Sequence, residues 1–474
     1  MEREILTKVS PVILPWRVKI LYAAGSFSKA LLAVTMAAFM LYFYTDVCGI
    51  DPTIAATIIL IAKVWDIVND PMMGAIIDRT RSKEGKCRWW LKYMSVPGMV
   101  IVALCFFMPE LTATGKIIWV AVTYVLQGMI STSLLLPFNT MISRLTSDEQ
   151  QRVQLTQADG IGQILSQWMV VSLTFTFVGW LGGGDSRKGF LYVGIIYGII
   201  YGIGHLIVYF ATRGYEPVEH TAESTESVTE RTGSVLKGLI TSMGAFYRNK
   251  VLLFCGAVAF LYTLGIAVEG GTMVWYFQYV KTDAEALYGI YGTVSMPVAI
   301  VVYLFLDKIV KRLGNARTVI AGCCFTLTGY MLGFVTHDAT KAIMMFRWFL
   351  EGIGQGLIGA VILLCVFDSK IYGVWKNNDN DSDAILTASY SLSYKIGMAI
   401  GGPILGYILA LVPYEAGAAV QPESVCNLFF YESTLIPGII YVLTLIFALL
   451  MRKYEKRIPQ MQKEIELRKQ EMAS

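Results

Sequence analysis

The chain has 474 residues, of which 55% are hydrophobic and only 16% are charged, and its formal net charge is +4 at pH 7. A soluble chain of this length would carry far more charge. Apolar runs long enough to cross the ~30 Å hydrocarbon core of a bilayer recur from end to end, and the composition therefore predicts a polytopic membrane protein.

The apolar runs predict twelve membrane spans. In chain order they cover residues 20–45, 53–77, 91–109, 116–141, 157–181, 189–211, 251–280, 286–306, 318–337, 341–367, 385–412 and 429–451. Most of the Lys and Arg residues lie in connections on the side that holds both termini, so both termini are predicted to be cytoplasmic. The first run is too long for a cleavable signal peptide and no small-residue cleavage site follows it. We expect a functional monomer in the plasma (inner) membrane.

A polar stretch that contains VEHTAESTESVTERTGS (218–234) divides the spans into six and six. Its Ser, Thr and Glu content is typical of a solvated linker. We therefore predict an N-terminal six-helix bundle over 1–211, a cytoplasmic linker over 212–250, a C-terminal six-helix bundle over 251–451 and a charged cytoplasmic tail over 452–474. An all-α membrane protein with two pseudo-symmetric bundles is the architecture of a major facilitator.

The second span contains an unusual polar stretch, AKVWDIVNDPMMG (62–74). At 100° per residue, Lys63, Asp66, Asn69 and Asp70 fall within about 120° of one helix face. An ionised side chain that faces lipid at the bilayer centre costs at least ~2.5–3.5 kcal/mol. These side chains are therefore predicted to face the interior of the bundle.

Carboxylate and amide oxygens one helical turn apart suit a small hard cation such as Na⁺ or Li⁺, with Asp66 and Asp70 as the charged ligands. Two neighbouring carboxylates also repel each other, so the same pair could bind a proton. The alternative is an inert buried ion-pair network with Lys63 and other basic residues. The sequence shows no nucleophile motif, metal-ligand set or nucleotide-binding loop, and its eight cysteines form no CxxC pair. We expect no enzyme activity, no cofactor other than a bound small cation or proton, and no nucleic-acid partner.

The pieces YFYTDVCGI (42–50), VWDIVNDPMMG (64–74), VTYVLQGM (122–129), LPFN (136–139), GIGQG (352–356) and ASYSLSYKIGMAIGG (388–402) occur in order over almost the whole chain. Together they resemble the glycoside–pentoside–hexuronide:cation symporters of the major facilitator superfamily. The resemblance implies uptake of a sugar or glycoside, driven by Na⁺, Li⁺ or H⁺, through alternating access.

The resemblance also implies roles for single residues. The family's cation residues on helix two match Asp66, Asn69 and Asp70. Its helix-four threonine falls on Thr132, with Ser131 or Ser133 as alternatives. Its helix-eleven lysine, which links the cation and sugar sites, matches Lys395, and Lys63 is a second candidate for coupling. The sugar-binding side chains of the family's best-known member fall on Ala30, Leu135, Asn139 and about Gly160, where none is kept, so its galactoside is not the expected substrate.

Sugars are held by aromatic faces and by polar side chains that bind hydroxyl groups. The candidates for substrate binding are Lys29, Asn139, Gln163, Glu269, Trp275, Gln355, Tyr390 and Tyr394. Further residues expected to face the cavity are Tyr44, Gln127, Asp159, Trp168 and Tyr276. Lys29 is equally a counter-charge for Asp66 and Asp70. For Glu269 the competing interpretation is an ion pair with Lys29, Arg347 or Lys395. Arg347 and Glu351 are spaced for a salt bridge within one helix.

The cytoplasmic end of the second span reads GAIIDR, and Asp78 and Arg79 match the facilitator motif G-x-x-x-D-R. We expect them to act in gating on the cytoplasmic side. Two other functions stay open from the sequence. One is a lipid or lysolipid symporter of the same superfamily, and the other is a non-transporting membrane sensor. Neither the sugar nor the driving ion can be read from the residues.

Overall fold

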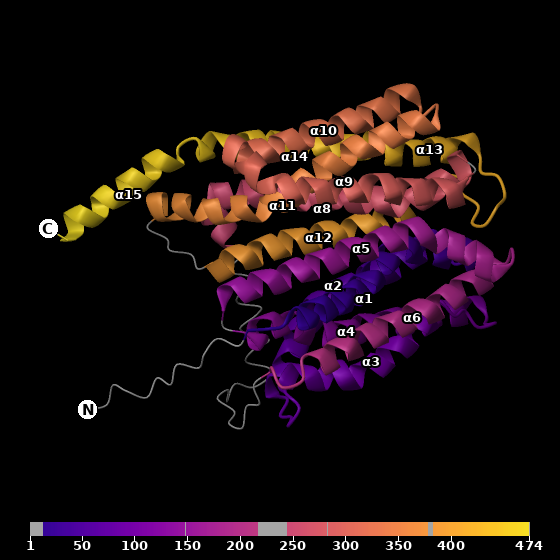
Figure 1. Ribbon diagram of the computed structural model, residues 1–474. Coiled ribbons are helices and arrows are strands. Elements are labelled where there is room, and N and C mark those ends of the chain that lie inside the picture. The colour runs from indigo at the N-terminus through magenta and orange to yellow at the C-terminus, as the bar shows by residue number, and fades with distance from the viewer. Residues whose placement is uncertain (1–12, 147, 217–243, 282, 378–382, 474) are drawn as a thin grey trace. The chain divides into compact units, whose positions relative to one another are not determined.

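The computed structural model describes residues 13–146, 148–216, 244–281, 283–377 and 383–473, in which all regular structure is helical (Figure 1). Most of the predicted linker lies outside these ranges. The helices are α1 (Trp16–Tyr42), η1 (Phe43–Val47), α2 (Pro52–Arg79), α3 (Lys86–Cys105), α4 (Ala113–Leu145), α5 (Glu149–Gly182), α6 (Ser186–Ala211), α8 (Lys250–Trp275), η2 (Tyr276–Val280), α9 (Ala284–Leu313), α10 (Asn315–Thr336), α11 (Lys341–Asn377), α12 (Asp383–Leu409), α13 (Glu423–Ser433), α14 (Leu435–Glu455) and α15 (Ile458–Ala473).

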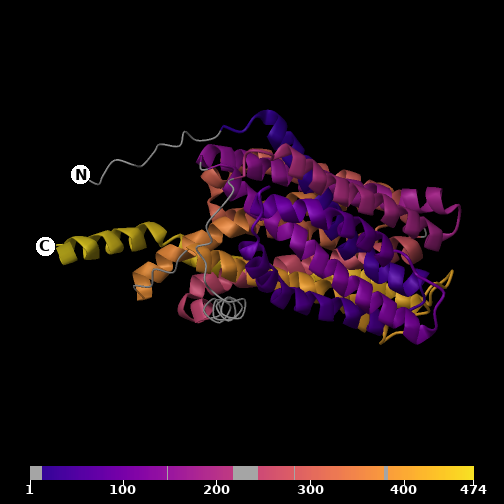
Figure 2. The ribbon, with the colours of Figure 1, turned by 90° about the horizontal axis from the view of Figure 1, so that it is seen from below.

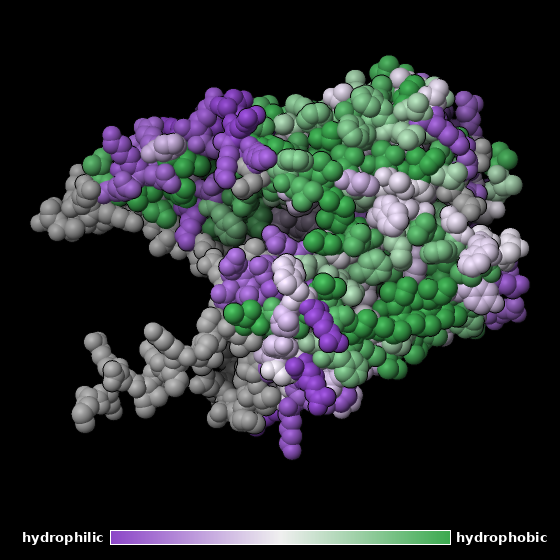
Figure 3. All heavy atoms as spheres, in the orientation of Figure 1, coloured by the Kyte–Doolittle hydropathy of each residue, from purple (hydrophilic) through white to green (hydrophobic). Residues whose placement is uncertain are grey.

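Among the described residues, 11 helical segments are long and apolar enough to cross a membrane. Helix α3 falls outside this set, and its first two turns carry the basic residues Lys86, Arg88 and Lys92. It covers most of the predicted span at 91–109, so that span alone of the twelve has no counterpart among these 11 segments. On the face shown in Figure 3, apolar side chains cover the sides of the helices, while hydrophilic side chains gather at helix ends and on α15. This distribution suits a bilayer.

The chain forms two compact units. The first contains residues 1–36 and 61–232, and the second contains residues 37–60 and 233–474. The hairpin that ends α1 and begins α2 therefore packs with the second unit, although the rest of both helices belongs to the first. Helices η1 and η2 are both short π-helical turns, and both lie in this second unit.

In the first unit, α3 packs against both α4 and α6. Glycines on α6 allow the close approach to α3. A Cβ atom on Gly198 would lie 2.6 Å from the carbonyl oxygen of Met99, and one on Gly202 would lie 2.3 Å from the Met99 side chain. Because the carbonyl belongs to the helix backbone and cannot move aside, the small residue sets the helix–helix distance.

In the second unit, the GIGQG motif of α11 packs helices together. A Cβ atom on Gly354 would lie 2.4 Å from the carbonyl oxygen of Gly322 on α10. Helix α15 contacts the end of α11, where the Trp375 indole donates to Glu464 and Arg468 donates to the Trp375 carbonyl at 2.8 Å. Figure 2 shows α15 extending from this contact to the C-terminus.

Glu216, which follows α6, caps the N-terminus of α3. Its carboxylate accepts the backbone N–H groups of Cys87 at 2.8 Å and Arg88 at 3.0 Å, and Arg144 of α4 donates to it at 3.2 Å. The Glu216 side chain is fully buried. A Cβ atom on Gly85 would lie 2.4 Å from this carboxylate, so the glycine makes room for the cap.

We expect Glu216→Ala to destabilise the first unit. A lost N-terminal cap costs ~0.5–2 kcal/mol, and the variant also loses the hydrogen bond from Arg144. The midpoint of thermal unfolding in detergent should fall clearly below that of the wild type. Glu84→Gln is the matched control. Glu84 also accepts a hydrogen bond from a basic side chain, Lys92, which lowers the pKa of its carboxyl group, but the Glu84 side chain is 36% exposed. Equal midpoints for the two variants would contradict the capping role.

Candidate functional site

The polar stripe of α2 lies on the side of this helix that faces α4. Asn69 is 2% exposed, whereas Trp65, on another face, is 36% exposed. The hydroxyl group of Thr132 on α4 donates to Asp70 Oδ1 at 3.0 Å. Asn69 is thus buried and Asp70 contacts α4, whereas the side chain of Lys63 is 44% exposed and that of Asp66 is 29% exposed.

Helix α4 supplies a matching stripe at four-residue spacing: Tyr124, Gly128 and Thr132. Tyr124 is 3% exposed and close enough to Lys63 and Asp66 to interact with their charges. A Cβ atom on Gly128 would lie only 2.8 Å from Asp66 Oδ1. The missing side chain at Gly128 thus lets the carboxylate of Asp66 reach the backbone of α4.

The neighbours of Thr132 make other contacts. The Ser133 hydroxyl group donates to the carbonyl of Ile130 at 2.6 Å, and Ser131 accepts a hydrogen bond from Gln127 at 2.7 Å. Of the three hydroxyl residues weighed from the sequence, Thr132 is the one that the structure brings to Asp70.

Charged and polar groups meet at this site. Lys63 Nζ lies 3.7 Å from Asp66 Oδ2, and Asp70 is close enough to Lys63 to interact with its charge. The amide nitrogen of Asn69 is buried and has no hydrogen-bond partner among the described residues. Carboxylate, amide and hydroxyl oxygens are ligands that hard cations prefer. The residues of this arrangement thus include the ligand types that a small cation would need, and its role as a cation or proton site stays a prediction.

We expect Gly128→Ala to weaken cation binding while the protein still folds. The new methyl group must displace the end of the Asp66 side chain, which is flexible, rather than the backbone. Changes beside a metal ligand commonly cost about 10- to 100-fold in affinity, so the Na⁺ or Li⁺ concentration for half-maximal uptake should rise at least about 10-fold. Gly160→Ala is the control, since nothing lies within 4 Å of its Cβ position. An unchanged cation dependence in Gly128→Ala would refute the contact.

Lys29, Asn139 and Gln163 gather around Asp159 in the same unit. Lys29 Nζ lies 2.7 Å from Asp159 Oδ1 and 3.1 Å from Asn139 Oδ1. The Gln163 amide donates to Asp159 Oδ2 at 2.6 Å, and Ser26 also donates to this carboxylate. Lys29 thus has Asp159 as its counter-charge. The amides of Asn139 and Gln163 are exposed.

The predicted gating residues lie at the end of α2. Asp78 forms an ion pair with Lys86 at 2.8 Å, which ties the end of α2 to the start of α3. Arg79 is the last residue of α2 and is exposed. The structure thus shows a contact within the first unit for Asp78, and the role of both residues in gating stays a prediction.

In the second unit, Glu269 is 1% exposed and accepts hydrogen bonds from neutral donors. These are the hydroxyl groups of Tyr330 at 2.6 Å and Tyr291 at 3.3 Å, and the amide of Gln355 at 2.9 Å. Glu269 and Gln355, both predicted to bind substrate, are therefore in direct contact. Among the described residues, no basic group forms a salt bridge with Glu269, so the ion-pair interpretation finds no support there.

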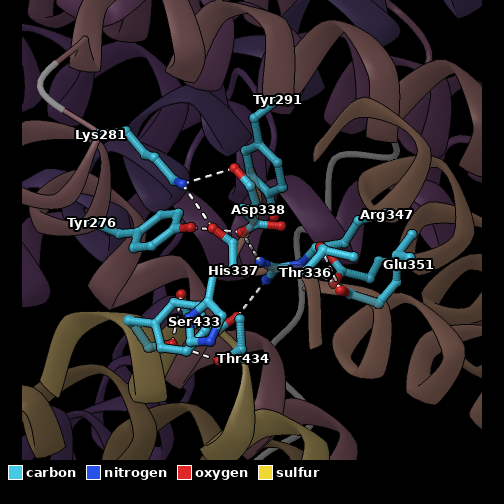
Figure 4. Close-up of polar contacts among 12 residues, drawn as sticks. Tyr276, Lys281, Tyr291, Thr336, His337, Asp338, Arg347, Glu351, Ser433 and Thr434 are labelled. Atoms are coloured by element: carbon cyan, nitrogen blue, oxygen red, sulfur yellow. Dashed lines mark hydrogen bonds and ion pairs between the residues drawn. The ribbon is translucent and has the colours of Figure 1, made fainter. Parts of the chain in front are cut away.

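The predicted salt bridge between Arg347 and Glu351 is confirmed at 2.7 Å, and it is part of a larger network (Figure 4). Arg347 is fully buried and also pairs with Asp338 at 2.6 Å. It donates to the carbonyl of Ser433 as well, and Tyr276 donates to Asp338 at 2.6 Å. One guanidinium group thus joins α11 to the loop before it and to the end of α13.

Trp275 is fully buried in this conformation, and its indole N–H points to Asp46 Oδ2 at 2.9 Å. Tyr279 and Tyr414 also donate to Asp46, each at 2.6 Å. Burial and the charge of Asp46 raise the pKa of Tyr414 above its usual value, so its hydroxyl group keeps its proton and donates. The sequence predicted that Trp275 contacts substrate. In the structure its indole N–H donates to Asp46 of η1, to which Tyr279 of η2 and Tyr414 of the loop after α12 also donate.

The other candidates in the second unit lie on α12. The rings of Tyr390 and Tyr394 lie 6.1 Å apart, and Tyr394 is 41% exposed. Tyr262 and Tyr303 lie close enough to this pair to interact with it. Sequence reasoning missed both, because single tyrosines in apolar spans carry no distinguishing signal. Lys395, one residue after Tyr394, is exposed.

A family model described as "MFS/sugar transport protein" matches residues 21–455. The chain belongs to this family. It is therefore a transporter and a multi-pass membrane protein, not an enzyme. The prediction of a major facilitator fold is confirmed.

Three proteins of known name resemble this chain over most of its length but share little sequence identity with it. The chain is 27% identical to the "isoprimeverose transporter" of Lactiplantibacillus pentosus, over 96% of this chain and 92% of that protein. It is 26% identical to the "putative glycoside/cation symporter YagG" of Escherichia coli K12, over 90% of this chain and 89% of that protein. The xylose transporter XylE from E. coli, at 12% identity, shares the fold with a TM-score of 0.61 over 93% of this chain and 99% of that chain.

Proposed function

We propose that this protein takes up a sugar or glycoside, whether a pentoside, hexoside or hexuronide, by secondary active transport coupled to a Na⁺, Li⁺ or H⁺ gradient. Relatives named for isoprimeverose transport and for glycoside/cation symport support the substrate class. Alternating access is the mechanism that suits two six-helix bundles. In this proposal both termini are cytoplasmic, and the monomer is the functional unit.

The observation that carries the coupling is the acidic pair of α2. Asp66 and Asp70 lie against Gly128 and Thr132 of α4, and two carboxylates this close in one helix repel each other. A cation or a proton at this pair reduces the repulsion and fixes α2 to α4. Coupling then follows if sugar and cation each raise the affinity for the other, which is a reciprocal free energy. Lys63 and Lys395 are the residues assigned to transmit it.

The substrate contacts are assigned to polar groups that already lie together. In the first unit, Asn139 and Gln163 present exposed amides beside the Lys29–Asp159 pair. In the second unit, Tyr390 and Tyr394 present aromatic faces on α12, and Gln355 and Glu269 present hydrogen-bonding groups. Amides that bind hydroxyl groups, together with aromatic faces for sugar C–H groups, favour a sugar over a lysolipid.

The proposal is tested by counterflow in proteoliposomes that contain the purified protein. Vesicles are loaded with one unlabelled solute from a panel of pentosides, hexosides, hexuronides and a lysolipid, and the entry of the labelled solute is followed with Na⁺, Li⁺ or an imposed proton gradient. Stimulated exchange of one sugar class by one of these ions is the expected result. Exchange of the lysolipid alone would favour the lipid carrier, and no exchange of any solute would favour the sensor.

A further inference from the structure

The second unit buries more acid than base. Glu269, Asp338, Glu351 and Glu432 are each at most 1% exposed, and Arg347 is the buried base that contacts two of them. Lys281, close by, donates to the carbonyl oxygens of His337 and Asp338. Even with both basic groups counted, four ionised carboxylates would leave two negative charges buried within a membrane protein. Buried charges of this kind are too costly to persist unless they are paired or neutralised.

Glu432, near the end of α13, is the member of this set with the fewest contacts. Among the described residues, its one hydrogen-bond contact is at 3.4 Å with the hydroxyl group of Thr272, which also donates to its own helix carbonyl at 3.0 Å. The other oxygen, Oε1, is buried and has no partner in the part of the chain that the structure describes. By contrast, Glu269 accepts three hydrogen bonds, and Arg347 holds both Asp338 and Glu351.

A metal ion does not account for this arrangement. The described residues contain no group of three or more His, Cys, Asp or Glu side chains placed to hold a metal. An ion pair does not account for it either, since no salt bridge among these residues includes Glu432. A carboxylate oxygen can only accept hydrogen bonds, and this site offers it almost no donor. A protonated carboxyl group needs much less, because it is neutral.

We propose that Glu432 is a proton-binding site of the second unit, separate from the acidic pair of α2, and that it holds its proton while α13 is packed against α8. If a rearrangement admits water beside Thr272, the O–H bond dissociates, the proton passes to water and the negative charge stays on Glu432. Helix α13 packs against α8, η2 and α14, which carry the titratable groups Glu269, Tyr276, Tyr279 and Tyr441. Beside Glu432 in the chain, the Ser433 carbonyl accepts a hydrogen bond from Arg347, and the ring of Phe430 stacks on His337.

Infrared spectroscopy of the purified protein at neutral pH tests this site directly, with the proton itself as the probe. A protonated carboxyl group has a C=O stretching band distinct from those of carboxylates, and the band shifts when H₂O is exchanged for D₂O. The wild-type protein should show this band, and Glu432→Gln should lose the part of it that Glu432 contributes. Asp66→Asn/Asp70→Asn should keep it. A spectrum without such a band in the wild type, or with the band unchanged in Glu432→Gln, would overturn the proposal.

Two further variants keep the test sharp if Glu432→Gln folds poorly. Thr272→Val leaves the acid in place but removes its one hydroxyl neighbour, so the band should shift without disappearing. Glu423→Gln changes an exposed acid at the start of the same helix, so it should leave the band unaltered. If the band does not shift in Thr272→Val, or if it changes in Glu423→Gln, it belongs to another group and the assignment is refuted. The measurement uses no sugar, so its outcome is independent of the proposed transport activity.

Discussion

Asp70→Asn is expected to abolish cation-stimulated uptake while the protein still reaches the membrane. The substitution keeps the size of the side chain and its ability to accept the Thr132 hydrogen bond, but it removes one of the two charges that attract the cation. Loss of one partner from a desolvated charge pair costs ~2–5 kcal/mol, which is roughly 30-fold to several thousand-fold in affinity. The measurement is the initial rate of tracer uptake against Na⁺, Li⁺ and proton concentration.

Asp66→Asn should have an effect of the same kind, because Asp66 is the second carboxylate of the pair. Glu110→Gln is the matched control, since Glu110 is an exposed acid of the same unit and lies in the connection between α3 and α4. Membrane levels of all three variants should be measured beside uptake. Normal sodium, lithium or proton stimulation in Asp70→Asn, at a normal membrane level, would remove the acidic pair from the coupling mechanism.

The α2 half of this site could be predicted because its residues lie close together in sequence. Helix geometry alone puts Asp66, Asn69 and Asp70 on one face, and the cost of exposing charge to lipid says which way that face must turn. The partner residue Thr132 lies 62 positions away. It could be chosen only through the family resemblance, and the choice over Ser131 and Ser133 required coordinates.

The remaining contacts could not be predicted, since they depend on how helices rotate against one another. Lys29 could reach several acids from the sequence alone, and packing of α1 on α5 gives it Asp159. Trp275 looks like a sugar-binding aromatic, yet it bonds to an aspartate more than 200 positions earlier. Glu432 lies in an ordinary stretch, CNLFFYEST, and only burial without a partner makes it notable.

Arg347→Met is expected to destabilise the second unit severely. The substitution removes the base that holds both Glu351 and Asp338 and leaves the carbonyl of Ser433 without its donor. Removing one partner from a buried ion pair costs ~3–5 kcal/mol, because the remaining charge is buried and uncompensated. A loss of this size is a large fraction of the ~5–15 kcal/mol that stabilises a typical protein. Membrane levels and the thermal unfolding midpoint in detergent should both fall steeply.

Lys341→Met provides the matched control for this effect. Lys341 lies on the same helix and pairs with Asp283 at 3.1 Å, but its side chain is 61% exposed. Exposed pairs contribute only ~0–1 kcal/mol, so this variant should stay close to the wild type. If the cost of Arg347→Met comes from buried charge, then adding Asp338→Asn and Glu351→Gln should restore part of the lost stability. A triple variant no more stable than Arg347→Met would show that the packing of the arginine side chain, and not its charge, stabilises this part of the unit.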